Sequence, residues 1–406
     1  MIRVLFVEAS SGGVVGGSLT GLYHQIRAMD RRRFAPAMVL YEPKAIEADL
    51  RALDVPVYHV HRRRMPKEHA LLKYEGYQRA KASSGVRSVL RFGRQSLRLA
   101  IEEGPAALQL AAIMRRARAD VVHLGNGVRA NFDGILACQL TRTPCVCHVK
   151  GFEKYTDRER WIASRIDVLV CMTRAVEDHC ARCGVRGRRT QVVYDALDEA
   201  AFAPQRDVAS VRAELGVGNG APCLGVIGNI QEWKGQAVLV EAMARIVDAV
   251  PDARGLIVGG VHRAGGAYHA QLEKRIRDLH LERALSITGF RSDIADVMNA
   301  LDVVVHTSVR PEPFGRVILE GMLLGKAVVA SAAGGVPELI DDGTTGFLTP
   351  PGDAAQLAAR LIPLLRDADL RRQVGARARA WAREHFNTER HVAEMGGIYQ
   401  DLVKGQ

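Results

Sequence analysis

One stretch decides the fold of this chain: Val303-Val-Val-His306-Thr-Ser308-Val-Arg-Pro-Glu312-Pro-Phe-Gly315-Arg-Val317-Ile-Leu-Glu320-Gly-Met-Leu-Leu324-Gly-Lys-Ala327-Val-Val-Ala330. It predicts a short buried strand, a loop with two prolines, an apolar helix from Val317 to Leu324, and a second buried strand. Strands joined through a helix run parallel in one sheet. Continuously apolar parallel strands are covered by helices on both faces, so the fold class is α/β.

The same alternation of apolar runs and amphipathic helices fills the rest of the chain. The further strands we expect are Ile2–Val7, Ala37–Leu40, Pro56–Val60, Val121–Leu124, Cys145–Val149, Val168–Cys171, Gln191–Tyr194, Leu224–Gly228, Leu256–Gly259, Leu285–Thr288 and Phe347–Leu348. Helical patterns separate most of them, for example Gly17–Ala28 and Gln236–Val250.

The chain of 406 residues is too long for one ordinary core and suits two domains. Glycines and prolines cluster between Asp198 and Pro222, where the alternation breaks. We therefore expect a first domain over 1–200, a linker over 201–222, a second domain over 223–375, and C-terminal helices over 376–406 that pack back on the first domain. Ligands of doubly wound sheets bind outside the carboxyl ends of the strands, so we expect the site in a cleft between the domains.

The loop before the helix at Val317 has the chemistry of a site for a phosphorylated sugar. Gly315 permits close approach of the backbone, and the free amides of Arg316 and Val317 can hold a diphosphate. Glu312 precedes this helix and Glu320 lies inside it, where carboxylates would accept hydrogen bonds from hydroxyl groups. The alternative is a capped helix with an internal glutamate, which would be costly if buried without a partner.

Three other positions follow predicted strands and add candidate residues. Lys234, in Gly228-Asn229-Ile-Gln-Glu-Trp-Lys234-Gly, is placed to reach phosphate oxygens, although a loop lysine alone is usually only solvated. Gly16 and Gly17 permit a tight turn and an exposed helix start. His148 stands at the carboxyl end of a strand, although a single histidine is more often structural.

These motifs resemble the retaining glycosyltransferases of family 4, which have the GT-B fold of two doubly wound Rossmann-like domains facing across a cleft. The resemblance implies that the first domain, 1–200, lies on the acceptor side and that the second domain, 223–375, binds the nucleotide sugar. The resemblance runs from the glycine-rich loop to the helix after Gly352, and its most specific part is the E-x7-E pattern of Glu312 and Glu320. It implies that Glu312 contacts the hydroxyls of the donor sugar and that Glu320 contacts the nucleotide ribose. His148 would contact the sugar near the reacting carbon.

The resemblance also implies a set of donor-binding residues. Lys234 would pair with the diphosphate, but Asn229 stands where the family usually has an arginine, which removes one cation. The nucleotide base would bind near Phe290 and Arg291 through main-chain groups. The remaining donor-binding candidates are Gly16, Gly17, Phe314, Gly315, Arg316 and Val317.

The positive charge of the chain is concentrated in one segment. The formal net charge is +11, and residues 62–118 hold fourteen Lys or Arg against four acidic residues, which leaves +10 there. From Val86 to Ile101 apolar residues and arginines fall on different faces of one helix. We expect this insertion to dock on an anionic membrane surface. A surface helix without a partner is the alternative, and the few aromatic residues argue against nucleic acid.

Together these features predict an enzyme, a glycosyltransferase that moves a sugar from a nucleoside diphosphate sugar to a hydroxyl acceptor. We expect a lipid-linked or cell-surface glycan precursor as acceptor, in polysaccharide biosynthesis. No cofactor or metal is expected, because Cys180 and Cys183 lack a second ligand pair and Asp367-Ala-Asp369 starts a helix. We expect a cytoplasmic protein, peripheral on the inner face of the membrane, because no apolar run reaches membrane-spanning length and seven cysteines without an export signal suit a reducing compartment.

Two alternatives come from other functional classes. An NAD-dependent oxidoreductase shares the alternating pattern, but the segment Ser10–Ser18 is no clean dinucleotide fingerprint, and the two glutamates would be unexplained. A non-catalytic protein that binds membrane or nucleic acid on the same scaffold would have no need of Glu312, Glu320 and Lys234.

Overall fold

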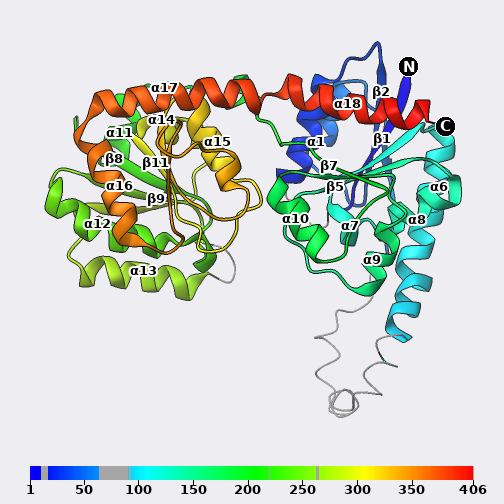
Figure 1. The fold of residues 1–406 in the computed structure, drawn as a ribbon, viewed down its shortest axis with the longest axis horizontal. Helices are drawn as coiled ribbons and strands as arrows, with labels where there is room; N and C mark the ends of the chain where they lie inside the picture. The colour runs from blue at the N-terminus through cyan, green and yellow to red at the C-terminus, as the bar shows by residue number, and fades with distance from the viewer. Residues whose placement is uncertain (11–16, 64–89, 91–92, 219, 262–264, 406) are drawn as a thin grey trace. The chain divides into compact units, whose positions relative to one another are not determined.

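The computed structural model describes residues 1–10, 17–63, 90, 93–218, 220–261 and 265–405, and it divides the chain into two compact units. The first unit comprises residues 1–172, 177–193 and 392–406, and the second comprises residues 173–176 and 194–391. Each unit is a parallel sheet with helices on its faces (Figure 1). The prediction of two doubly wound α/β domains is confirmed, and every strand expected from the sequence is present.

The first unit has a seven-stranded sheet in the order β3-β2-β1-β4-β5-β6-β7. Its strands are parallel throughout, and all four residues of β4 are buried, as expected for a strand covered on both faces. The strands are β1 (Ile2–Glu8), β2 (Phe34–Leu40), β3 (Val57–His59), β4 (Val121–Leu124), β5 (Cys145–Val149), β6 (Val168–Cys171) and β7 (Arg189–Val192).

The helices of the first unit connect these strands and close the sheet. They are α1 (Gly17–Ala28), α2 (Glu47–Ala52), the π-helix η1 (Leu99–Glu103), α6 (Gly104–Arg116), α7 (Gly127–Ala130), α8 (Phe132–Thr141), α9 (Asp157–Ala163) and α10 (Arg174–Arg182). Residues 93–98, just before η1, are also helical.

The second unit has a six-stranded sheet in the order β10-β9-β8-β11-β12-β13. Its strands are β8 (Cys223–Ile227), β9 (Arg254–Val258), β10 (Leu285–Gly289), β11 (Val303–His306), β12 (Ala327–Ser331) and β13 (Phe347–Thr349). Its helices are η2 (Ala200–Phe202), α11 (Val208–Glu214), η3 (Glu232–Lys234), α12 (Gln236–Ala249), α13 (Gly266–Asp278), α14 (Ile294–Ala300), α15 (Arg316–Leu323), η4 (Val336–Glu338), α16 (Ala354–Arg366) and α17 (Ala368–His385).

The C-terminal helix α18 (Thr388–Lys404) returns to the first unit, to which residues 392–406 belong. Its Tyr399 is fully buried. The Tyr399 hydroxyl accepts a hydrogen bond from Gln25 Nε2 at 2.7 Å and is hydrogen-bonded to His123 Nδ1 at 2.6 Å. The Tyr399 ring also meets Phe6 and Phe34 edge to face. The last helix therefore completes the core of the first unit, although almost 200 residues of the chain separate it from the rest of that unit.

The observed boundaries differ from the expected ones in two places. The predicted linker over 201–222 contains helix α11, whose first turn is capped by Asp207 through a 2.9 Å bond from the Ser210 amide, and these residues belong to the second unit. Helix α17 also belongs to the second unit, so the return to the first unit begins at 392, not 376. Glycine and proline clusters mark turns, which can lie within a folded unit as well as between units.

The predicted basic insertion lies partly outside the described residues, which omit 64–89 and 91–92. Its described end, residues 93–116, is helical through α6. Among the described residues, none of the helices has the length and apolar character needed to cross a membrane.

Candidate functional site

In the second unit, two loops meet at the carboxyl ends of neighbouring strands. Strand β8 pairs with β11, so the loop through Lys234 and the loop over residues 307–315 leave the sheet side by side. The Thr307 hydroxyl donates to the Lys234 carbonyl at 2.9 Å, and the Val309 amide donates to the Trp233 carbonyl at 2.9 Å. Gly235 allows this approach, because a Cβ there would lie 2.1 Å from the Thr307 carbonyl oxygen.

Glu312 is the centre of this meeting point. One of its carboxylate oxygens, Oε2, lies 2.8 Å from Lys234 Nζ, 3.2 Å from Ser308 Oγ and 3.4 Å from His306 Nε2. The Glu312 side chain is 14% exposed and that of Lys234 is 21% exposed, so the pair lies at the surface of a largely buried cluster. The structure thus brings together Glu312 and Lys234, which the sequence suggested separately.

The charge of Glu312 is fixed by its neighbours. Burial alone would raise the pKa of its carboxyl group, but the hydrogen bond with His306 and the positive charge of Lys234 outweigh burial and lower that pKa to about 2. Glu312 is therefore ionised at neutral pH and accepts hydrogen bonds without donating them. Such a group suits hydroxyl ligands.

The backbone of Glu312 is held by the loop after β12. The Gly335 amide donates to the Glu312 carbonyl at 2.8 Å, and Glu312 forms an isolated bridge with Gly334. Gly334 has φ 71°, and a Cβ there would lie 2.2 Å from the Glu312 carbonyl oxygen. This loop positions the carboxylate.

Helix α15 begins directly after Gly315, which has φ 96°. No acidic residue lies in its first turn, so no carboxylate there neutralises the positive end of the helix. The free amides near Arg316 and Val317 can therefore bind an anion. Phe314 is only 4% exposed, and its ring packs against Phe386 at 5.9 Å, so its side chain belongs to the core. Only the backbone of Phe314 remains a candidate for donor binding.

Glu320 lies one turn into α15 with its side chain 13% exposed. Burial raises the pKa of Glu320, and the charge of Arg316 only partly offsets this. Arg316 Nε donates to Glu320 Oε1 at 3.0 Å. The largely buried Glu320 therefore has a partner, and the same bond occupies the guanidinium of Arg316.

Three other donor-binding candidates lie on loops of this unit. Asn229 is exposed, and its carbonyl accepts a 3.0 Å hydrogen bond from Gln236. Phe290, after β10, is 78% exposed, which leaves its ring open for stacking. Arg291, in contrast, is held by carboxylates: its Nε donates to Asp293 at 2.8 Å, and it also pairs with Glu214. Its side chain ties this loop to α11.

The candidates in the first unit are placed differently. His148 ends β5 with no exposed surface, and its ring lies 5.7 Å from that of His123. Gly17 is the first residue of α1, whereas Gly16 lies outside the described residues. Lys150 reaches over α1, since a Cβ on Gly21 would lie 3.0 Å from its Nζ. The roles given to these residues stay predictions.

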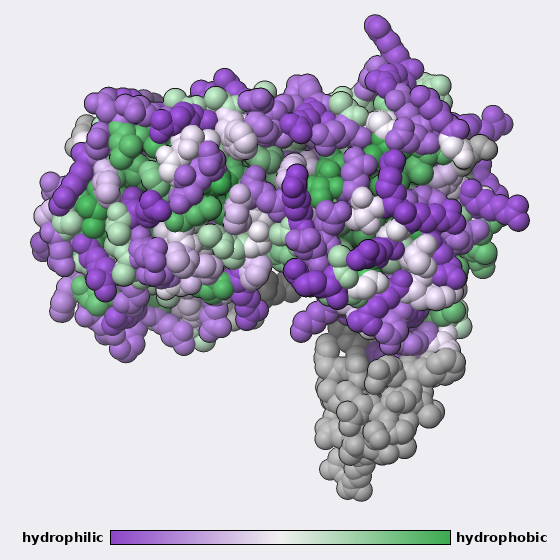
Figure 2. Space-filling view, in the orientation of Figure 1, coloured by the Kyte–Doolittle hydropathy of each residue, from purple (hydrophilic) through white to green (hydrophobic). Residues whose placement is uncertain are grey.

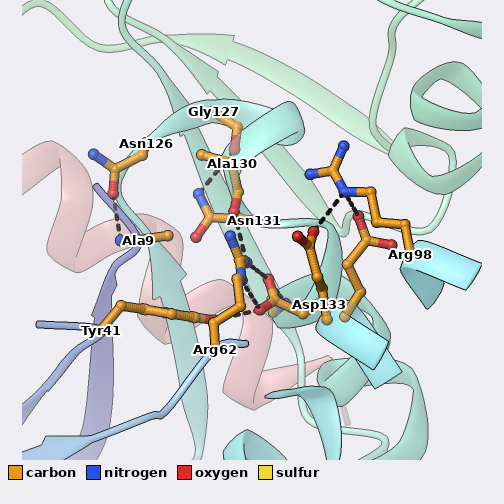
Figure 3. Close-up of polar contacts among 12 residues, drawn as sticks. Ala9, Tyr41, Arg62, Arg98, Asn126, Gly127, Ala130, Asn131 and Asp133 are labelled. Carbon is orange, nitrogen blue, oxygen red and sulfur yellow. Dashed lines mark hydrogen bonds and ion pairs between the residues drawn. The ribbon is translucent and has the colours of Figure 1, made fainter. Parts of the chain in front are cut away.

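The first unit also contains a buried ion pair that the sequence did not suggest (Figure 3). Asp133 is fully buried and pairs through both carboxylate oxygens with Arg62. Tyr41 donates to Asp133 Oδ2 at 2.8 Å, and Arg62 also donates to the Ala130 carbonyl at 3.1 Å. Arg98 Nε similarly lies 3.0 Å from carboxylate oxygens of Glu102 and Glu103. Arg62 of the basic segment is therefore largely buried, whereas Arg98 pairs with carboxylates of its own helical segment and stays 42% exposed.

Sequence reasoning missed His306 and Ser308 as site residues. His306 was identified only as the end of a strand, yet side chains at the carboxyl ends of parallel strands are where ligands bind. The position of His306 at the carboxyl end of a strand was the signal that could have identified it as a site residue. Among the described residues, no group of three or more His, Cys, Asp or Glu side chains could hold a metal ion.

The chain matches two family models. The model described as Glycosyltransferase Family 4 covers residues 15–201, and the model described as Glycosyl transferases group 1 covers residues 207–381. The division between them falls close to the boundary between the two units.

Individual proteins resemble the chain over most of one or both units. N-acetyl-alpha-D-glucosaminyl L-malate synthase of Bacillus anthracis is 27% identical over 308 residues, 73% of this chain and 79% of that protein. D-inositol 3-phosphate glycosyltransferase of Corynebacterium kroppenstedtii is 33% identical over 253 residues, 61% of this chain and 56% of that protein. The crystal structure of Alr3699/HepE from Anabaena with UDP and glucose superimposes with a TM-score of 0.78 at 25% identity, covering 99% of this chain and 100% of that one.

Proposed function

Because this chain is a glycosyltransferase of the family 4 type with the GT-B fold, we propose that it transfers a sugar from a nucleoside diphosphate donor to a hydroxyl acceptor. We further propose that the anomeric configuration is retained. The oxidoreductase alternative is set aside by the family matches. The non-catalytic alternative is disfavoured by the ionised Glu312 beside Lys234.

The arrangement around Glu312 is the observation that carries this proposal. A carboxylate that is charged, partly exposed and held by two loops accepts hydrogen bonds from sugar hydroxyls. The ammonium of Lys234 stands 2.8 Å away, and helix α15, with its free amides, begins at Arg316, shortly after Glu312 in the chain. One unit therefore contains a hydrogen-bond acceptor for the sugar and positively charged or donor groups for the diphosphate.

The proposed reaction uses these groups without a metal or a bound cofactor. The bond between the anomeric carbon and the diphosphate oxygen breaks, and a bond to the acceptor oxygen forms, with the acceptor proton leaving to the diphosphate. Lys234 and the α15 amides stabilise the charge that develops on the departing diphosphate. Glu312 orients the sugar and Glu320 the ribose, each as a hydrogen-bond acceptor.

UDP is the first nucleotide to test, because Alr3699/HepE was solved with UDP and glucose. Thermal shift against UDP, GDP and ADP should show the largest stabilisation with one of them, and the matching sugar nucleotides should then release that nucleotide in the presence of acceptor. Failure of all three nucleotides to raise the melting temperature would contradict a nucleoside diphosphate donor.

We propose that the acceptor is a hydroxylated molecule. Lipid-linked and cell-surface glycan precursors belong to this class, and so do smaller molecules. The names of two relatives point to small acceptors, malate and inositol phosphate. A panel of both kinds, offered with the donor found above, distinguishes them by which product forms.

An anionic membrane surface is the partner we propose for the end of the basic segment. Large apolar side chains are exposed along residues 93–116: Leu97 is 46% exposed, Ile101 39% and Leu108 64%. Figure 2 shows hydrophobic residues among hydrophilic ones at the edge of the first unit that carries α6. Exposed apolar groups beside basic ones suit the interface of an anionic bilayer.

Vesicle sedimentation tests this partner. The wild-type chain should bind phosphatidylglycerol vesicles at low salt and lose that binding at high salt. The double substitution Leu97→Gln with Ile101→Gln should weaken binding, whereas Leu140→Gln, at a residue that is 50% exposed on α8, should not. Equal binding by both variants, or none by the wild type, would exclude this surface.

A further inference from the structure

The second unit has a pocket that is bordered by Trp233, the chain neighbour of Lys234, and that contains none of the donor-binding candidates. The cavity has a volume of about 310 Å³ and is lined by η3, the start of α13 and the loop after β11. Its size lies at the lower end of the range of about 300–1,000 Å³ that is typical of small-molecule sites. The side chains that matter are Gln231, Glu232, Trp233, Tyr268, Gln271 and Arg310.

One wall of the pocket is aromatic. Trp233 is half-buried, and its ring centroid lies 4.1 Å from Lys234 Nζ, so the indole is braced by the ammonium of the donor site. Its Nε1 donates to Gln231 Oε1 at 2.7 Å, which fixes the ring orientation. Tyr268 is 9% exposed and its hydroxyl accepts the Ala237 amide at 3.0 Å, so this side chain is fixed as well.

The rest of the lining offers polar groups that are not committed to the protein. Because Gln231 Oε1 accepts from Trp233, the amide nitrogen of Gln231 remains a donor. Within the part of the chain that the structure describes, the side chains of Glu232, Gln271 and Arg310 have no hydrogen-bonding partner. A pocket with one fixed aromatic wall and several free donors and acceptors fits a ring that is apolar on its face and hydroxylated at its edge.

We propose that this pocket binds a pyranose ring, stacked on Trp233 and hydrogen-bonded through Gln231, Glu232 and Gln271. The C–H groups of the ring pack against the indole, while its hydroxyls meet the amides and the carboxylate. Because Trp233 also braces Lys234, a sugar held here lies next to the proposed donor site. The ligand class that the pocket selects is a glycoside, an inference that rests on the proposed transferase function.

Saturation-transfer NMR on the full chain tests the pocket with methyl pyranosides of glucose, galactose, mannose and N-acetylglucosamine. UDP is kept saturating, so that the nucleotide site is occupied. At least one methyl glycoside should bind, and Gln271→Trp, which fills the cavity from α13, should weaken that binding about tenfold or more. Gln271→Leu, which removes only the amide, should weaken it less.

The matched control is Gln373→Trp, because Gln373 is also an exposed glutamine on a helix of this unit but lies on α17. It should leave glycoside binding unchanged. Absence of binding by all four glycosides, or equal binding by Gln271→Trp and Gln373→Trp, overturns the proposal. UDP binding in the same samples is read separately by thermal shift, so loss of the donor site is not mistaken for loss of the pocket.

Adding the sugar nucleotide donor shows whether the bound glycoside is an acceptor or an effector. Conversion of the bound methyl glycoside to a disaccharide glycoside identifies it as an acceptor. Binding without conversion identifies a free sugar that occupies the pocket as an effector. Both results support a pyranose site, and only the first makes it part of the acceptor.

Discussion

Arg62–Asp133 in the first unit and Lys234–Glu312 in the second are both ion pairs between residues far apart in the sequence. The Asp133 side chain has no exposed surface and that of Arg62 is 17% exposed, whereas Glu312 and Lys234 are 14% and 21% exposed. Tyr41 and the Gly134 amide donate to Asp133, and Arg62 reaches the Ala130 carbonyl as well. Among the residues that the structure describes, Glu312 is the one carboxylate paired with Lys234, which leaves the Lys234 ammonium able to turn to a ligand.

The difference separates a structural pair from a functional one. A buried pair whose two carboxylate oxygens are both hydrogen-bonded to protein groups fixes a local arrangement and leaves no carboxylate oxygen for a ligand. A pair at the end of two strands can exchange its internal bond for bonds to sugar and phosphate. Each prediction below tests one side of this contrast, from the largest expected effect to the smallest.

Asp133→Ala should cost the largest amount of stability. It leaves the guanidinium of Arg62 buried without its carboxylate, for which a loss of about 3–5 kcal/mol is expected. Urea unfolding followed by circular dichroism measures this loss. Asp157→Ala removes an ion pair whose carboxylate is 96% exposed, and it should have no measurable effect. Similar unfolding curves for both variants would remove the distinction.

Glu312→Ala should act on turnover rather than on folding. Loss of a hydrogen-bond acceptor that orients the sugar should reduce kcat by about 100- to 1,000-fold, or about 2.7–4 kcal/mol, with nucleotide binding retained. Steady-state assays and UDP thermal shifts on the same variant measure the two effects. Glu384→Ala, an exposed glutamate of α17, serves as control. Unchanged turnover in Glu312→Ala would refute its role.

Gly235→Ala should disturb the junction that holds Lys234 opposite Glu312. Its φ of 67° costs an alanine about 1–2 kcal/mol, and overlap with the Thr307 carbonyl adds about 1–3 kcal/mol. Gly343→Ala shares a positive φ of 81° but meets nothing within 4 Å, so it measures the conformational cost alone. The melting temperature should fall further in Gly235→Ala, and equal falls would show that the two loops are not in tight contact.

Glu320→Gln should give a small gain in stability that depends on pH. Burial raises the pKa of Glu320 in the folded protein, so its ionisation opposes folding as the pH rises through the ordinary range of a glutamate. The gain should be present at neutral pH and vanish below about pH 4. Glu312→Gln should show the opposite sign, because the folded-state pKa of Glu312 is lowered. Parallel pH profiles for the two variants would contradict these directions.

Much of the fold could be predicted because the signals are local. Runs such as Val303–His306 and Val168–Cys171 are rich in valine, a β-branched apolar residue that suits strands covered on both faces. Helix α11 was missed for a physical reason: it is short and polar, with Val211 as its only buried residue, and it lies among turn-forming glycines and prolines. A weak apolar pattern gives little warning of a helix.

Of the candidate site, the sequence determined the residue types and their order: Lys234 after one strand, and Glu312, Gly315 and Glu320 after another. Only the tertiary structure decided which of these touch. Lys234 and Glu312 are 78 positions apart, and they meet because β8 and β11 are neighbours in the sheet.

The same reason explains the residues whose surroundings the sequence did not reveal. Arg62 belongs to the basic segment by its place in the sequence, but Asp133, 71 positions away, holds its side chain in a largely buried pair. His306 joins Glu312 only because the loop after its strand turns back. Local pattern determined the elements and their order, because helices and strands form from neighbouring residues. The order of the strands in the sheet and the burial of side chains decided which residues pair, because charged residues that are far apart in the sequence meet only in the folded chain.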